Sequence, residues 1–259
     1  MSIDLHQRGL AGLELELELF GSSAAGRVLR SPGVIASLSP GTPDRSIFNS
    51  VAASDAAALE ASIDQLAATY DDAGVRAWTV WVPDRDRASA TLLERRGHVL
   101  DGSPRSMGLD LRDLSPPDRP LPRGTELVEV DLVEVGRIND LAYGIEGPGW
   151  QYAIGPEPDL PVHTLAAVVD GEAASCAVVI DGEDDACVTG VATVPGYRGE
   201  GLAAAIVARL LTDSRERGLQ TGTLQASAAG SPVYARLGFS DVGFIELWEL
   251  RRPARPPVA

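Results

Sequence analysis

The stretch Val191–Leu211, VATVPGYRGEGLAAAIVARLL, runs from an apolar segment through a proline and glycines into a long aliphatic periodicity. Pro195 ends the apolar segment, and the spacing of aliphatic residues after Gly201 predicts a helix that Gly218 closes. A strand that ends in a glycine loop and then opens a helix is an anion site, because free backbone N–H groups and the helix dipole converge there. The stretch therefore predicts a phosphate-binding loop.

Three classes of ligand use such a loop. A P-loop needs a lysine, and all 22 basic residues of this chain are arginine. A Rossmann loop fits the letters GEGLAA, but that fold also needs an acidic residue about 20 positions later, at the end of the next strand. The next predicted strand ends TLQAS, with no acid before Asp241. The pyrophosphate of acyl-CoA is the remaining candidate.

Two segments resemble the GNAT acetyltransferase superfamily. VPGYRGEGLA, Val194–Ala203, is similar to that family's R-x-x-G-x-G/A loop, and SPVYARLGF, Ser231–Phe239, is similar to the later segment that ends Y-x-x-L-G-F. The resemblance implies an α+β fold with a central mixed, mostly antiparallel sheet flanked by helices. It also implies acetyl-CoA as cosubstrate, an amine as acceptor and no metal.

The resemblance carries roles to individual residues. Main-chain groups at the strand end would bind the pantetheine arm: Ala192, Thr193 and Val194. Backbone N–H groups of the loop would hold the pyrophosphate: Arg198, Gly199, Glu200, Gly201, Leu202, Ala203 and Ala204. The Glu200 carboxylate is expected to point to solvent. Ser227 stands where many family members carry asparagine and would contact the CoA arm. Tyr234 would be the general acid for the departing thiolate, because a phenol pKa of about 10 suits that leaving group.

The general base stays open. Many family members place a glutamate on the strand before the loop, but here that strand reads ACVTGVATV, with no carboxylate. Four other residues are candidates: Glu146, Glu157, His163 and Glu246. A dispersed group of acids that acts through water is a further alternative. Trp150, in a Gly/Pro-rich segment, is a candidate for lining the acceptor pocket, with ordinary packing as the alternative.

The chain also contains a short internal repeat. Residues 92–111 and 233–250 align on Gly97 and Gly238, which places Leu93 at the position of Tyr234. The segment LSPPDRPLPRG, rich in proline, is the best domain boundary. We therefore predict two tandem GNAT-like domains, at 1–114 and 124–252, joined by a linker at 115–123 and followed by a tail at 253–259.

The first of these domains is expected to be degenerate. Its segment SVAASDAAALEAS, at the position of the loop, has no R-x-x-G-x-G, and Leu93 replaces the tyrosine. It would serve as a scaffold or as one wall of the acceptor site. Near its start, GLELELELF alternates as a strand does, but Leu13, Leu17 and Phe20 also fit a helical stripe, which we favour. The segment SIFNSVAA is expected to be a strand.

Composition limits the partners. The net charge of −15 argues against nucleic acid, because phosphate-binding proteins carry a basic face. Residues 124–259 hold 20 acidic residues and 9 arginines, a net −11 that would attract a cationic amine or merely favour solubility. The two cysteines and three histidines show no metal spacing. No targeting segment and no apolar run of about 18 residues is present, so we expect a cytoplasmic protein without membrane contact.

The expected activity is direct transfer of acetyl from acetyl-CoA to an amine in a ternary complex. The alternative is a non-catalytic acyl-CoA sensor or partner-binding module with the same fold. The missing strand glutamate favours this alternative, and the retained Tyr234 disfavours it. The acceptor stays open among a small-molecule amine, a peptide N-terminus and a protein lysine, and a homodimer is left open as well.

Overall fold

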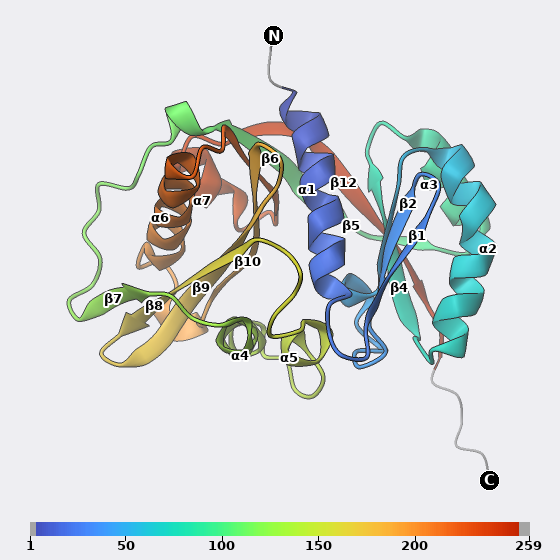
Figure 1. Ribbon diagram of the computed structural model, residues 1–259, viewed down its shortest axis with the longest axis horizontal. Coiled ribbons are helices and arrows are strands. Elements are labelled where there is room, and N and C mark those ends of the chain that lie inside the picture. The colour runs from blue at the N-terminus through green and yellow to red at the C-terminus, as the bar shows by residue number, and fades with distance from the viewer. Residues whose placement is uncertain (1–3, 254–259) are drawn as a thin grey trace.

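The computed structural model describes residues 4–253, so residues 254–259 of the predicted tail lie outside the described residues (Figure 1). The helices are α1 (Leu5–Phe20), α2 (Ala56–Asp72), α3 (Arg87–Arg95), α4 (Leu132–Tyr143), α5 (Trp150–Ala153), α6 (Leu202–Glu216) and α7 (Ser231–Arg236). The strands are β1 (Arg27–Ser31), β2 (Val34–Leu38), β3 (Ser50–Ala53), β4 (Ala77–Pro83), β5 (Val99–Gly102), β6 (Arg105–Asp110), β7 (Thr125–Val128), β8 (Val162–Val169), β9 (Glu172–Asp181), β10 (Asp185–Thr193), β11 (Thr221–Ala226) and β12 (Ser240–Arg251). Three 3₁₀ turns complete the elements: η1 (Ser46–Phe48), η2 (Leu111–Asp113) and η3 (Pro195–Tyr197).

All strands join one sheet of 12 strands, in the order β1-β2-β3-β4-β12-β6-β11-β10-β9-β8-β7, with β5 beside β12. Among the described strands, only the pairs β3–β4 and β10–β11 are parallel. The expected mixed, mostly antiparallel sheet flanked by helices is therefore confirmed. The two parallel pairs occupy equivalent places in the two halves. In each pair, a long helix connects the first strand to the second.

The last strand of each half is exchanged into the other half. β6 of the first half pairs with β11, and β12 of the second half pairs with β4 through residues 245–251. The two exchanged strands also pair with each other through residues 105–108 and 240–244. The sheet consequently runs through both halves without a break.

β10 and β11 part after a short stretch of pairing. Their parallel register covers Asp185–Val188 against Thr221–Leu224, and β10 then continues along β9 with a register shift between Thr189 and Ala192. β11 instead continues along β6 as far as Ala226. We call this divergence the parting of β10 and β11. It leaves main-chain groups at the end of β10 without a strand partner on that edge.

α1 lies across the middle of the sheet and contacts both halves (Figure 1). The favoured helix for GLELELELF is confirmed, with Asp4 as its N-cap and Leu13, Leu17 and Phe20 buried. Gly12 allows the close approach: a Cβ there would lie 3.0 Å from Thr223 Oγ1 and 3.2 Å from the Cys187 side chain. α1 therefore belongs by sequence to the first half and by contact to both.

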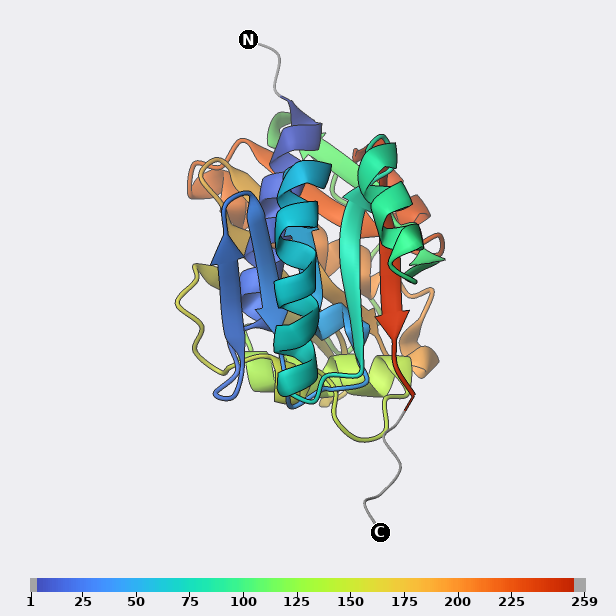
Figure 2. The same cartoon turned by 90° about the vertical axis from the view of Figure 1, so that its right-hand side faces the viewer.

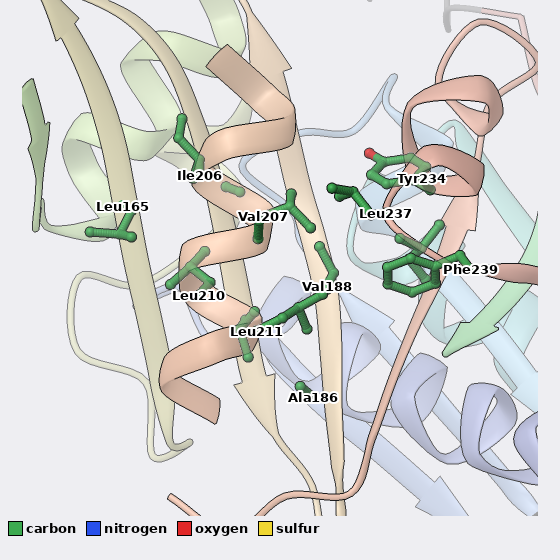
Figure 3. Close-up of a cluster of buried hydrophobic side chains, with 14 of the residues drawn as sticks. Leu165, Ala186, Val188, Ile206, Val207, Leu210, Leu211, Tyr234, Leu237 and Phe239 are labelled. Atoms are coloured by element: carbon green, nitrogen blue, oxygen red, sulfur yellow. The ribbon is translucent and has the colours of Figure 1, made fainter. Parts of the chain in front are cut away.

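The helices divide the buried side chains into separate clusters. α6 and α7 cover one face of the second half, where Val188, Ile206, Leu211, Tyr234 and Phe239 pack together (Figure 3). α4 and α5 cover the opposite face of the same strands, together with the end of α1. α2 and α3 cover the outer face of the first half (Figure 2).

Most predicted elements are found near their expected bounds, with one partial correction. SIFNSVAA was expected to be a strand throughout, but its first part is the turn η1 and only residues 50–53 form β3. Asn49 explains the turn, because its side chain accepts a hydrogen bond from the Ser39 N–H and donates to the carbonyls of Thr42 and Arg45. Side-chain to backbone bonds of this kind compete with strand pairing.

Candidate functional site

The glycine loop before α6 presents unpaired backbone donors. Gly199 and Gly201 have φ of 81° and 83°, a left-handed conformation that glycine adopts without strain. Gly201 caps α6 without a side-chain bond. Within residues 4–253, the N–H groups of residues 199–204 donate to no protein acceptor. These donors and the positive end of the helix dipole suit an anion.

Arg119, from the proline-rich segment, lies over this loop. Its Nη1 donates to the Gly199 carbonyl at 2.8 Å, and its Nη2 donates to Glu200 Oε2 at 3.2 Å. Glu200, which was expected to point to solvent, therefore turns toward a guanidinium while staying half exposed. The carboxylate is thus partly neutralised beside the N–H groups of the loop.

Arg198 holds the loop against its neighbours. Its Nε donates to the Thr193 carbonyl at 3.1 Å, and its Nη2 donates to the Ala142 carbonyl at 2.7 Å. The loop is thereby tied both to the end of β10 and to the last turn of α4. Arg198 contributes shape to the site as well as charge.

The end of β10 carries Ala192, Thr193 and Val194. The Ala192 carbonyl accepts a hydrogen bond from Ser175 Oγ at 2.8 Å, and the Val194 N–H donates to a carbonyl of β9 at 2.9 Å. Successive residues of a strand direct their main-chain groups to opposite edges, so Thr193 faces the parting. Its carbonyl is the one that accepts from Arg198.

Tyr234 lies on α7, on the same side of the sheet as α6 (Figure 3). The side chain is 8 % exposed, and burial raises its pKa above the ordinary value, so the phenol keeps its proton at neutral pH. Ser227 forms the turn before α7, where its Oγ accepts from the Gly230 N–H at 3.1 Å. The structure thus places Tyr234 beside α6, and Ser227 at the exposed entry to α7.

Tyr143 is a residue of the site that the sequence did not reveal. It ends α4, and its hydroxyl donates to the Val191 carbonyl at 3.4 Å. Burial raises the pKa of Tyr143 and Arg198 opposes that rise, while Tyr143 adds a smaller part to the rise in pKa that burial causes at Tyr234. Three elements therefore converge at the parting of β10 and β11: α4, β10 and α7.

Trp150 stands against the irregular part of β10. A Cβ on Gly190, which has φ of 59°, would lie 2.7 Å from the edge of the Trp150 indole. The ring also packs edge-on against Phe20 and Phe48, with centroids 6.1 Å from each. Asn139 Nδ2 donates to the Gly190 carbonyl at 3.1 Å. Trp150 is thus both a packed core residue and a neighbour of the parting.

The four sequence candidates for the general base lie in other settings. His163 Nε2 lies 3.1 Å from Asp181 Oδ2, and Arg217 also pairs with Asp181. Glu246 on β12 accepts from Arg87 at 2.8 Å and from the Trp248 indole at 2.9 Å. Glu146 and Glu157 are exposed in the loops around α5.

Another carboxylate does reach β10. Glu16 of α1 accepts a hydrogen bond from Thr189 Oγ1. Burial raises its pKa from 4.5 to about 7, and the bond from Thr189 offsets part of that rise. The sequence did not single out Glu16, because this residue is one of three glutamates in the repeated LE pattern of α1.

The first half lacks the corresponding loop. Its long helix α2 begins at Asp55, whose carboxylate accepts from the Ala58 N–H at 2.9 Å. A negative charge therefore occupies the helix end that is open in α6. Leu93, at the position of Tyr234, is fully buried. The aligned glycines agree closely: Gly97 and Gly238 have φ of 84° and 103°, and each ends a short helix.

The described residues contain neither a helix that could span a membrane nor a cluster suited to a metal ion. No helix among residues 4–253 is long and apolar enough to cross a membrane. In the same range, no cluster of three or more His, Cys, Asp or Glu side chains suits a metal ion.

Comparison with known proteins gives a domain-model match within the second half and a fold for the whole chain. Residues 176–242 match the family model described as an acetyltransferase (GNAT) domain. No curated protein sequence matches the chain. A GCN5-related N-acetyltransferase from Kribbella flavida is 17% identical with a TM-score of 0.67, and the alignment covers 98% of this chain and 97% of that one.

Two further solved structures have similar folds. A tandem GNAT protein from the clavulanic acid biosynthesis pathway is 15% identical with a TM-score of 0.58, and the alignment covers 96% of this chain and 97% of that one. A GCN5-related N-acetyltransferase-like protein from Streptococcus suis is 18% identical with a TM-score of 0.57, over 94% of this chain and 100% of that one. The likeness thus extends over both halves of the chain.

Proposed function

We propose that the second half of this chain, where residues 176–242 match the acetyltransferase (GNAT) domain model, transfers acetyl from acetyl-CoA to an amine. The observation that carries the proposal is the set of unpaired N–H groups at residues 199–204, next to the parting of β10 and β11. The pyrophosphate would bind these donors, and the pantetheine arm would run along the open edge of β10 at Thr193.

The chemistry would be a direct attack of the amine on the thioester. An acyl-enzyme would need an activated nucleophile, but burial raises the pKa of Cys176 to about 12 and also raises that of Cys187. Tyr234 would donate its proton to the departing sulfur, because its buried phenol stays neutral until a strong base forms beside it.

Replacing Tyr234 tests this role. Tyr234→Phe should lower turnover about 100-fold or more, which is the usual contribution of general acid catalysis, and should leave CoA affinity within about twofold of wild type. Turnover is measured as CoA release, with a panel that includes a polyamine, an amino sugar and a peptide with a free N-terminus. Tyr152→Phe, at an exposed tyrosine, is the matched control. Unchanged turnover in Tyr234→Phe would remove it as the acid.

Isothermal titration with CoA tests the location of the site. We expect one equivalent per chain, held by the second half. Two equivalents of similar affinity would contradict the degenerate first half. Binding without acetylation of any amine would favour the alternative, a non-catalytic acyl-CoA sensor.

A further inference from the structure

α1 brings side chains of the first half onto strands of the second. Gly12 has no side chain, which lets α1 pack closely against Cys187 and Thr223. The next turn of α1 therefore passes over the point where β10 and β11 separate. Glu16 lies on that turn, four residues after Gly12, and therefore on the same face of the helix. The contact of Glu16 with Thr189 follows from this placement.

The face of the parting that α1 covers carries polar side chains. Cys187 pairs with Thr223 on the face that α1 covers, and Thr189 and Gln225 each follow two residues later on their own strands. Both side chains then point toward α1. Gln225 donates to Ser106 Oγ at a long 3.4 Å, and its Oε1 is buried without a hydrogen-bond partner within residues 4–253. A buried carbonyl oxygen without a hydrogen-bond donor is unfavourable in free energy, and the N–H groups of an amine would supply the missing donor.

Glu16 and Tyr234 approach the parting from opposite faces of the sheet. Val188 points into the cluster of α6 and α7 that contains Tyr234, whereas Thr189, the next residue, points to α1 and Glu16. A thioester in the parting would thus have an acid on one side and a carboxylate on the other. This arrangement matches attack from one side and departure of sulfur on the other.

We infer that Glu16, supplied by the first half of the chain, is the general base that takes the proton from the attacking amine, with Gln225 Oε1 as a second acceptor for that nitrogen. This inference rests on the proposed acetyl transfer. It assigns a catalytic group to the half that lacks a CoA loop. Glu16 would take the place of the glutamate that many family members carry on the strand before the loop and that β10 lacks.

The surroundings of Glu16 suit a base. Within residues 4–253 no arginine pairs with it, whereas the neighbouring Glu18 is paired with Arg30. The ionisable groups of β10 that face α1 are the Cys187 thiol and the Asp185 carboxyl, both buried, and both with raised pKa. Burial likewise raises the pKa of Glu16 to about 7, where a base operates most effectively at neutral pH.

The step balances as follows. The ammonium group of the acceptor gives one proton to the Glu16 carboxylate, and the freed nitrogen lone pair forms the N–C bond to the acetyl carbonyl. The C–S bond then breaks, and the sulfur leaves with the electron pair and takes the Tyr234 proton. The second nitrogen proton restores Tyr234. The products are the acetamide, CoA thiol and one proton, which Glu16 releases to solvent.

Glu16→Gln tests the inference, with Glu14→Gln on the exposed face of the same helix as the matched control. We measure CoA affinity by titration, and CoA release from acetyl-CoA with the amine panel and with water alone. Glu16→Gln should release CoA about 100-fold more slowly at unchanged CoA affinity, and Glu14→Gln should match wild type. Glu16→Asp should recover part of the rate. The wild-type rate should rise with pH through about 7, and this rise should vanish in Glu16→Gln.

The outcomes separate the two proposals. Wild-type rates and an unchanged pH profile in Glu16→Gln would overturn the role of Glu16 and leave the acetyl transfer standing. CoA binding by wild type with no CoA release under any condition would overturn the acetyl transfer, and the role of Glu16 with it. A loss of CoA affinity in Glu16→Gln equal to the loss of rate would show a structural role and would also overturn the inference.

Discussion

Single residues at the parting of β10 and β11 have functions that depend on three-dimensional contacts. Gly190 is the clearest case, because its positive φ and the Trp150 indole both exclude a side chain. The sequence marked Gly201 and Tyr234 through recognisable motifs, since their roles are tied to local segments. It could not mark Gly190, Tyr143 or Glu16, because their roles arise only from packing between distant segments.

Gly190→Ala should destabilise the protein by about 2 kcal/mol, because a left-handed alanine is strained and its Cβ would overlap the Trp150 ring. The free energy of unfolding in urea measures this effect. Gly196→Ala is the control, since no atom lies within 4 Å of its added Cβ and its φ is not positive. Equal stability of the two variants would contradict the packing argument.

At the scale of elements, the two long helices after the parallel strands have opposite N-termini. The N-cap of α6 is a glycine, which offers no side-chain hydrogen bond to the helix. The N-cap of α2 is an aspartate whose side chain accepts a hydrogen bond from the first turn. Local sequence predicted the start of α6, because caps and glycines act within one turn. It also favoured a helix for GLELELELF, but it did not reveal the edge strands β1 and β7.

Asp55→Ala should cost about 1 kcal/mol of stability, the usual contribution of an N-cap, as measured by urea unfolding. It should not create a second CoA site, because removing the carboxylate does not supply the glycine loop. Titration of Asp55→Ala with CoA should therefore still give one equivalent per chain. A second equivalent would show that the aspartate alone had closed the first half to phosphate.

At the scale of the whole molecule, the exchange of β6 and β12 joins the halves. The internal repeat predicted two related halves, and the tandem fold is confirmed. It did not predict the exchange, because strand pairing across residues 105–110 and 221–226 depends on contacts far apart in the sequence. In the first half alone, β4 would lose β12 and β6 would lose β11. In the second half alone, β11 would lose β6 and β12 would lose β4.

Residues 124–252 expressed alone should therefore fail to fold, because β11 would lose β6 and β12 would lose β4. Circular dichroism and amide exchange of the fragment measure this. The control is the full chain cut at an engineered protease site in the exposed segment 116–120, which should stay assembled because no strand is removed. A folded, CoA-binding fragment would contradict the interdependence of the halves.

The exchange of β12 also sets an order of events during translation. β4, with the sequence AWTVWVP, leaves the ribosome long before residues 245–251 that cover its edge. The nascent chain thus carries an apolar strand with an open edge through most of its synthesis, a state prone to aggregation. Completion of the first half must wait until β12, the last of the described strands, is made, so a ribosome that stops early releases a chain in which neither half is finished.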